Sequence, residues 1–217
     1  MNRNKARVDG IKIASVDLAR QVNKSFEEHK QAWKIQSKNS SKDKTWIPPP
    51  PSWINLNFDA AIREGKTFVA VTGRDQEGKF VAAWEEQLCP GSPLSGEANA
   101  ALWAIQRAAN ASFKNVVIEG DSWNVIEPLR NQESTPHWSI KSVVEDILYF
   151  AKGFDNVNFS FVLREGNEVA HLLARWAAFL NWNGPVPISI LSPLIIQALD
   201  RDGHRPNLDC ISLFSSK

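Results

Sequence analysis

Apolar and polar residues alternate most regularly between Trp53 and Asp59, where the chain reads W-I-N-L-N-F-D. The alternating positions are Ile54, Leu56 and Phe58 on one side and Asn55, Asn57 and Asp59 on the other. This period of two predicts a strand with an apolar and a polar face, which Asp59 is expected to end on the polar side. A carboxylate is costly to bury unless a cation or a hydrogen-bond donor meets it. Asp59 is therefore the first candidate for a functional site.

The next part of the chain favours an antiparallel meander. Two β-rich runs, T-F-V-A-V-T at 67–72 and K-F-V-A-A-W-E-E-Q-L at 79–88, are separated by a turn-type sequence with a glycine at each end, Gly73 and Gly78. Short strands joined by such turns are typical of neighbouring antiparallel strands. Residues 54–88 are thus expected to supply three consecutive strands.

A helix is predicted from Glu97 to Ala111, because prolines and a glycine break the chain at 90–93 and the following residues are rich in Ala, Leu and Ile. Ser95 is its expected N-cap. Glu97 then falls in the first turn, where the helix dipole favours an acid in any protein. Its position alone is therefore no sign of function.

The second half of the chain alternates between strands and helices. The apolar run N-V-V-I at 115–118 suits a buried parallel strand, and Asp121 lies at its carboxyl end. Sites in open α/β sheets form at that end of the strands, although Asp121 is equally well explained as a helix N-cap. The remaining predicted elements are helices at 123–130, 140–150 and 167–180 and a strand at 157–163. The order βββαβα, a further helix, then βα indicates an α/β fold.

Charge is distributed unevenly along the chain. Residues 1–45 hold 11 Lys and Arg against 5 Asp and Glu, whereas residues 46–217 hold 14 against 19. A basic arm can add phosphate contacts to a nucleic-acid binder through counterion release. The alternative is a solvated helix and linker, and the charge alone does not decide between them.

Composition is that of one globular domain with appendages. We expect a basic, partly helical extension and linker at 1–45, one domain at 46–200 and a C-terminal tail at 201–217. The two cysteines, Cys89 and Cys210, have no paired spacing that would indicate a disulfide framework or a zinc site. The N-terminus lacks the apolar run of a secretory signal, and no segment reaches membrane-spanning length. An intracellular protein is the expectation.

Three acids fall on elements that this order can bring side by side: Asp59, Glu97 and Asp121. Converging carboxylates favour hard divalent cations, which bind oxygen ligands and support phosphoryl-transfer chemistry. The segments that carry these acids, W-I-N-L-N-F-D-A-A, S-G-E-A-N-A-A-L-W-A-I and V-I-E-G-D-S, together with G-R-D-Q-E-G-K-F and V-L-R-E-G-N-E-V-A-H-L-L-A-R, also form a family pattern. From Pro48 to Asp200 the chain resembles the ribonuclease H type 1 fold, and most closely the plant ribonuclease-H-like domain related to non-LTR retroelement reverse transcriptases.

The resemblance implies a ribonuclease H-like fold with a mixed five-stranded sheet flanked by helices. It also implies a metal-dependent endonuclease that cleaves the RNA strand of RNA–DNA hybrids. Asp59, Glu97 and Asp121 match the catalytic, metal-binding carboxylates of the family, which hold two Mg²⁺ ions about 3.5–4 Å apart. Asn99 and Ser122, close to these positions, are candidate contacts for the 2′-hydroxyl or phosphate groups of the nucleic acid.

The chain departs from the family at the fourth catalytic and metal-binding position, where His171 stands in place of a carboxylate. An imidazole brings no negative charge, so the ions are less well compensated, and Mn²⁺ suits such a ligand better than Mg²⁺. The loop Arg164 to Gly166 also lacks the histidine that assists product release in the family, and Glu165 is a candidate replacement. Ala60 replaces the family's glycine after the first Asp, a milder change.

Two alternatives to a hybrid-cleaving enzyme remain open at this point. The substitution at His171 favours a catalytically weak or inactive module that still binds nucleic acid, whereas retention of three acids favours the enzyme. A structural scaffold is the other alternative, in which Trp176, Trp182 and the segment 186–199 recruit a partner protein. That segment is more simply interpreted as a short element that folds back onto the domain.

Overall fold

The computed structural model describes residues 46–131 and 133–202. The basic, partly helical extension predicted at 1–45 and Cys210 lie outside the described residues. The proposed division at residues 45 and 200 therefore stays a prediction. Within the described part of the chain, no helix combines the length and the apolar character needed to cross a membrane.

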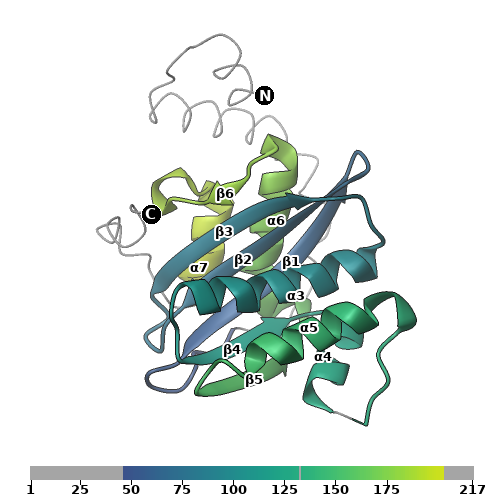
Figure 1. Ribbon diagram of the computed structural model, residues 1–217. Helices are drawn as coiled ribbons and strands as arrows, with labels where there is room; N and C mark the ends of the chain where they lie inside the picture. Colours follow the sequence, from purple (N-terminus) through teal and green to yellow (C-terminus); the bar gives the residue numbers. More distant parts are fainter. Residues whose placement is uncertain (1–45, 132, 203–217) are drawn as a thin grey trace.

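A mixed sheet forms the centre of the domain, with strand order β5-β4-β1-β2-β3-β6 (Figure 1). The first three strands form the predicted antiparallel meander, and β4 pairs in parallel with both β1 and β5. The strands are β1 (Ile54–Arg63), β2 (Lys66–Arg74), β3 (Phe80–Leu88), β4 (Asn115–Gly120), β5 (Asn156–Phe161) and β6 (Gly184–Pro185).

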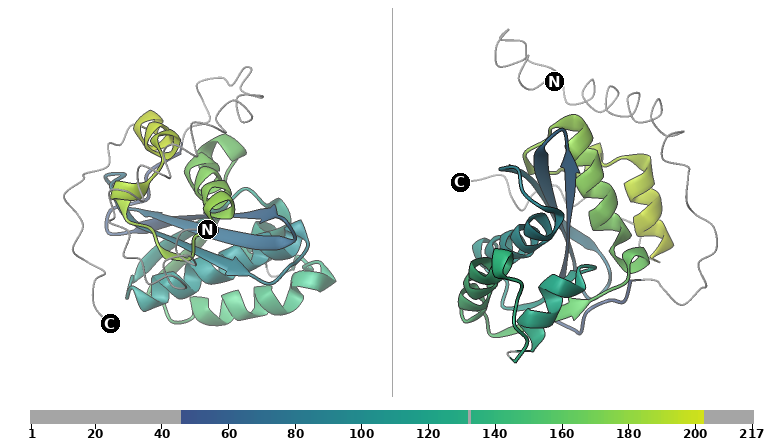
Figure 2. Two further views of the ribbon diagram at one scale, coloured as in Figure 1. Left: turned by 90° about the horizontal axis from the view of Figure 1, so that it is seen from above. Right: turned by 90° about the vertical axis from the view of Figure 1, so that its right-hand side faces the viewer.

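Helices cover both faces of the sheet (Figure 2). One face packs against α3 (Pro93–Asn110), α4 (Trp123–Arg130) and α5 (Lys141–Ala151), and the other against α6 (Glu168–Leu180) and α7 (Pro193–Arg201). Three short 3₁₀ turns complete the described elements: η1 (Trp138–Ile140), η2 (Arg164–Asn167) and η3 (Ile188–Ile190). This three-layer arrangement confirms the predicted α/β class.

The sheet has one strand more than predicted. β6 consists of Gly184 and Pro185 alone, and it pairs with β3 through Glu85 and Trp84. So short a strand leaves no periodicity in the sequence, which is why the pattern did not reveal it. The residues after it continue through η3 into α7, which packs on α6. The prediction that segment 186–199 folds back onto the domain is confirmed.

Two predicted boundaries were wrong. β1 does not end at Asp59 but runs four residues further and pairs with β2 as far as Arg63 opposite Lys66. No turn residue interrupts A-A-I-R after Asp59, and the reversal occurs only at Glu64 and Gly65, both with positive φ. Asp59 therefore lies inside a paired strand, where its position is more tightly fixed than at a strand end.

The helix α3 begins at Pro93, four residues before the predicted start. Ser92 is its N-cap and accepts a hydrogen bond from the Ser95 amide at 3.1 Å. Proline at the first helical position is favourable because its missing N–H would have no partner there. Ser95 is therefore not the cap, and Glu97 lies beyond the first turn. The dipole explanation for Glu97 is weakened accordingly, since the dipole effect falls off within that turn.

The alternation in β1 separates two environments, as the sequence predicts. Leu56 and Phe58 belong to the apolar cluster on the α3 side. Asn55, Asn57 and Asp59 project from the other face and are nonetheless buried. A row of buried polar groups on a central strand requires partners, and those partners define the candidate site.

Candidate active site

Parallel pairing of β1 and β4 brings Asp121 beside Asp59. The pairing extends to Asn57 opposite Glu119, and Asp121 follows the last residue of β4. Gly120 is required at that last position, since a Cβ there would lie 2.4 Å from the ring of Phe58. The glycine allows β1 and β4 to approach closely near Asp59 and Asp121. Asp121 thus lies at the carboxyl end of a buried parallel strand, as predicted, while Ser122 is the N-cap of α4.

Glu97 reaches the same place from α3, which crosses the sheet above β1 and β2. A Cβ on Gly96 would lie 3.2 Å from Thr67 Cγ2 and 3.3 Å from Ala60 Cβ, so the helix sits close against these strands. The Ala60 backbone amide donates a hydrogen bond to the Glu97 carboxyl group. The residue after Asp59 thereby holds the second acid in position.

The three predicted acids form one cluster. One carboxylate oxygen from each of Asp59, Glu97 and Asp121 lies within 4.8 Å of the others. Burial, with the neighbouring charges of Asp59 and Asp121, raises the pKa of Glu97 to about 9. Burial also raises the pKa of Asp59, although a hydrogen bond from His171 opposes that effect. In the absence of a cation, these two carboxyl groups therefore take up protons more readily than ordinary acids do.

Arg164 is the principal cation at this cluster, and the sequence did not point to it. Its Nη1 lies 2.9 Å from Asp121 Oδ2 and 3.5 Å from Asp59 Oδ1. The arginine comes from η2, the loop in which Glu165 was considered as a replacement for the family histidine. Its side chain is 54% exposed, whereas that of Asp59 is fully buried. Arg164 thus covers the cluster from its solvent side.

Asn167 is a second residue that the sequence did not reveal. Its side-chain amide donates to the backbone carbonyl of Phe58 at 2.9 Å and to Asp121 Oδ1 at 3.2 Å. It is fully buried and closes η2. One side chain therefore ties the loop that bears Arg164 to β1 and orients Asp121 as well.

His171 lies beside Asp59, with Nδ1 3.0 Å from Asp59 Oδ2. Arg164 Nη2 lies 2.6 Å from Nδ1 and 2.8 Å from Nε2 of the same ring. A guanidinium only donates hydrogen bonds, so the ring nitrogen that it binds must accept. A neutral ring with its proton on Nδ1 satisfies both partners, because Nδ1 donates to Asp59 and Nε2 accepts from Arg164. His171 thus contacts Asp59 of the cluster, and the resemblance proposes it for the fourth catalytic and metal-binding position.

Asn99 and Ser122, the candidate nucleic-acid contacts, have different surroundings. The Asn99 side-chain amide donates to the Ser95 carbonyl at 2.7 Å, one turn back along α3. Asn99 also lines a shallow depression that includes Glu86 and Arg107. Ser122 follows Asp121 directly and is half-buried at the start of α4. Of the two, Ser122 is the one that the chain holds next to a carboxylate of the cluster.

The donor set fits a hard divalent cation. Carboxylate oxygens are the ligands that Mg²⁺ and Mn²⁺ take in proteins. Asp59 Oδ1 and Glu97 Oε2 are buried and accept no hydrogen bond from any residue that the structure describes. Buried carboxylate oxygens without a hydrogen bond are costly, and a cation between them would remove that cost.

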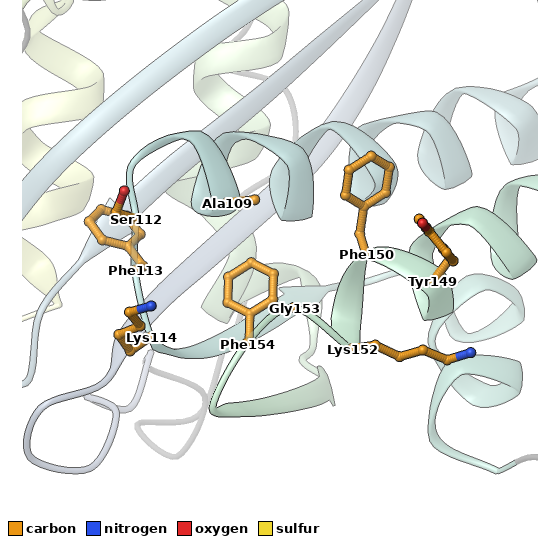
Figure 3. A pocket seen from close by; sticks show the side chains of 9 residues that line it. All are labelled: Ala109, Ser112, Phe113, Lys114, Tyr149, Phe150, Lys152, Gly153 and Phe154. Carbon is orange, nitrogen blue, oxygen red and sulfur yellow. The ribbon is translucent and has the colours of Figure 1, made fainter.

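A separate surface depression lies away from this cluster. It encloses about 430 Å³ and is lined by Lys114 and Lys152 with aromatic residues that include Tyr149 and Phe154 (Figure 3). Lys114 immediately precedes β4, whereas Asp121 immediately follows it. The depression is thus at the opposite end of that strand from the carboxylates, and it has no acidic residue in its lining.

Comparison of the sequence with protein families gives one decisive match. The profile of the reverse transcriptase-like family matches residues 57–177, more than half of the chain. The chain belongs to the reverse transcriptase-like family. The match begins before Asp59 and ends after His171, so the family region contains every residue of the cluster. No curated protein sequence matches the chain at a significant level.

Solved structures show the same fold. RNase H1 from the halophilic archaeon Halobacterium salinarum is 23% identical, with a TM-score of 0.55 over 60% of this chain and 99% of that one. The N-terminal RNase H domain of a Mycobacterium tuberculosis protein is 16% identical, with a TM-score of 0.53 over 59% and 97%. LC11-RNase H1, isolated from compost, is also 16% identical, with a TM-score of 0.51 over 59% and 96%. The family member described here therefore has an RNase H-like fold.

Proposed function

We propose that this protein is a divalent-metal-dependent endoribonuclease that cleaves the RNA strand of RNA–DNA hybrids. The observation that carries the proposal is the convergence of Asp59, Glu97 and Asp121, from three separate elements, within 4.8 Å. A cluster assembled from residues 62 positions apart is maintained against its own repulsion, which a purely structural role does not require. The RNase H-like fold and the reverse transcriptase-like family support a nuclease that binds nucleic acid.

The three carboxylates would hold two Mg²⁺ or Mn²⁺ ions, with His171 at the fourth position. When bound, such ions supply an activated water and charge stabilisation for phosphoryl transfer. His171 keeps Asp59 oriented through the hydrogen bond from Nδ1. Asn167 does the same for Asp121. These fixed orientations place acceptor oxygens for the ions before any substrate arrives.

Arg164 has a different role in this proposal. Without an ion, it neutralises part of the charge on Asp59 and Asp121. Asp59 and Asp121, which pair with the guanidinium, are also carboxylates that would hold a divalent cation. Since Arg164 is half-exposed, its side chain can swing toward solvent and pair with a phosphate of the nucleic acid, a good partner for a guanidinium.

A binding module without catalysis is the second candidate, and His171 is the observation that favours it. A neutral imidazole in place of a carboxylate leaves one fewer negative charge to hold the ions. In that case the fold would retain its affinity for hybrids and lose cleavage. The two candidates differ in one measurable property, which is metal-dependent cleavage.

The test is cleavage of an end-labelled RNA–DNA hybrid by the purified protein in Mg²⁺ and, separately, in Mn²⁺. Asp59→Asn removes a cluster carboxylate, and Asp146→Asn is the matched control because Asp146 is an exposed acid on α5. We expect RNA-strand cleavage by the parent and by Asp146→Asn, with more in Mn²⁺ than in Mg²⁺. Asp59→Asn is expected to be silent.

His171→Asp separates the two candidates. If the parent is inert in both metals, still binds the hybrid, and gains cleavage as His171→Asp, it is a binding module whose chemistry was lost at that position. If parent and Asp59→Asn cleave equally, the carboxylate cluster is not the active site and the proposal fails.

A further inference from the structure

An exposed tryptophan borders the carboxylate cluster. Trp123 is the first residue of α4, two positions after Asp121, and its side chain is 50% exposed. Two residues span at most about 7 Å between Cα atoms. The backbone of Trp123 therefore lies close to Asp121, on the part of the molecule where β4 and β5 end.

The indole is held in a defined orientation. Its ring meets that of Phe161 in a T-shaped contact, with ring centroids 5.4 Å apart and an interplanar angle of 85°. Phe161 is the last residue of β5 and pairs with Gly120 of β4. The supporting ring thus belongs to the same sheet edge that presents Asp121. An aromatic ring that is fixed in advance loses little conformational entropy when a second ring stacks on it.

Most other tryptophans among the described residues are buried in the core. Trp46, Trp84, Trp103 and Trp176 are all buried. Trp123 has an aromatic neighbour and still leaves half of its surface in solvent, next to the only group of acids in the described residues that meets the geometry of a metal site. The exposed face of Trp123 is therefore available to stack on an aromatic ring of the substrate.

We propose that Trp123 is a specificity-determining residue that stacks on an unpaired nucleobase of the substrate. This inference rests on the proposed nuclease function, because the carboxylates fix where the reacting phosphate lies. The base of that nucleotide is only one sugar away from the phosphate. Every base has a π-face that an indole can cover, without regard to sequence.

The substrate class follows from the geometry of stacking. In a continuous duplex both faces of each internal base are already covered by neighbouring bases. An indole can stack only where a face is open, at a bulge, at a frayed end or at a junction with single-stranded RNA. The preferred substrate is therefore a hybrid with an unpaired ribonucleotide at or next to the cleaved position, in preference to a uniform hybrid.

The test compares binding of two fluorescently labelled RNA–DNA hybrids that differ only in one bulged ribonucleotide. The full-length protein carries Asp59→Asn in every sample, so that no substrate is consumed and binding is measured separately from cleavage. The added variants are Trp123→Ala, Trp123→Phe and, as the matched control, Trp138→Ala. Trp138 is 82% exposed and belongs to η1, which holds no cluster residue.

We expect the bulged hybrid to bind more tightly than the uniform one. Trp123→Ala should weaken binding of the bulged hybrid by about 5- to 150-fold, the range for loss of one base–aromatic stack, and affect the uniform hybrid little. Trp123→Phe should retain most of the preference, and Trp138→Ala all of it. Equal losses on both hybrids, or equal effects of the two alanine variants, would overturn the inference.

The cleavage assay on the parent keeps the two proposals separable. If the parent does not cleave but the Trp123-dependent preference is present, the nuclease proposal fails and the stacking platform stands as a binding site. If the parent cleaves and the preference is absent, only the platform is wrong. If the parent does not cleave and neither hybrid binds, both are overturned.

Discussion

Two polar clusters lie on the same face of β1, two residues apart, and they are built differently. In the first, Asn55 and Asn57 both donate to Glu119 Oε2, at 3.1 and 3.0 Å. Arg74 donates to Asn57 Oδ1 at 2.9 Å and to Asp202 Oδ2 at 2.6 Å. In the second, the carboxylates of Asp59, Glu97 and Asp121 lie together, and the half-exposed Arg164 contacts the first and the last of them.

The position of the arginine explains the difference. Arg74 is fully buried and its guanidinium carbon lies 3.6 Å from the ring centre of Trp46, so its side chain cannot move into solvent. Through Asp202 it also ties the end of α7 to the sheet. Arg164 is 54% exposed and free to exchange its partners for water. A buried cation makes a polar cluster structural, whereas an exchangeable one leaves the acids open to other cations.

Arg74→Met provides the largest test of this contrast. It leaves Asp202 and Asn57 without their buried partner, and breaking a buried pair from one side costs about 3–5 kcal/mol. The free energy of unfolding in urea should fall by that amount. Arg201→Met is the control, since Arg201 forms an exposed ion pair with Glu168 and should cost at most about 1 kcal/mol. Equal losses would show that burial does not distinguish the two arginines.

Metal removal tests the second cluster. If the acids bind a divalent ion, Mn²⁺ at 100 times its Kd should raise the free energy of unfolding by about 2.7 kcal/mol, and EDTA should abolish the gain. Asp59→Asn should show much less of this stabilisation. Asp146→Asn should respond like the parent, because Asp146 lies on α5 outside the cluster. Stabilisation that persists in Asp59→Asn would place the ion elsewhere.

Glu85 is a third acid on the sheet and has no cation at all among the described residues. It is fully buried on β3, both its oxygens are unpartnered, and burial raises its pKa well above 4.5. The folded state therefore keeps a proton that the unfolded chain releases above pH 4.5. The contribution of Glu85 to stability is complete below that pH and declines as the pH rises toward the pKa of the folded state.

Glu85→Gln removes this titration. Relative to the parent, the variant should gain up to about 2.5 kcal/mol of unfolding free energy between pH 5 and pH 7, because one proton difference changes the stability by about 1.4 kcal/mol per pH unit. Urea unfolding at the two pH values measures the gain. Glu86→Gln is the control, because Glu86 is partly exposed and paired with Arg107, and its difference from the parent should change little over this range. A constant difference for Glu85→Gln would mean that the carboxyl group is ionised when buried.

The sequence predicted the positions of Asp59 and Asp121 because each of them follows a segment with a strong local pattern. Asp59 follows a period-two strand, and Asp121 follows a continuous apolar one. Arg164 and Asn167 carry no such pattern, because η2 is a single turn placed by contacts with residues far away in the sequence. The hydrogen bond from Asn167 to the Phe58 carbonyl spans 109 residues, and no local periodicity encodes a contact of that kind.

The errors in element boundaries have a similar origin. The period in β1 breaks after Asp59, yet pairing with β2 continues because hydrogen bonds between backbones do not depend on side-chain alternation. The early start of α3 depends on Pro93, which the sequence pattern predicts to be a helix breaker but which is the first helical residue. Proline has both roles, and only its place relative to Ser92 distinguishes them.

The smallest expected effect is also the one that most directly tests exchange at the second cluster. Arg164→Gln leaves the acids without their half-exposed cation, and we expect it to lower the unfolding free energy in EDTA by about 1 kcal/mol, a value reduced by solvent screening. Saturating Mn²⁺ should restore the loss, because the ion replaces the charge that the arginine supplied. Arg74→Met should gain from Mn²⁺ only what the parent gains, so its deficit relative to the parent should persist, because its own cluster is closed. Urea unfolding of both variants and of the parent, with and without Mn²⁺, measures the two deficits, and a deficit that disappears in both variants or in neither would mean that the two arginines have the same role.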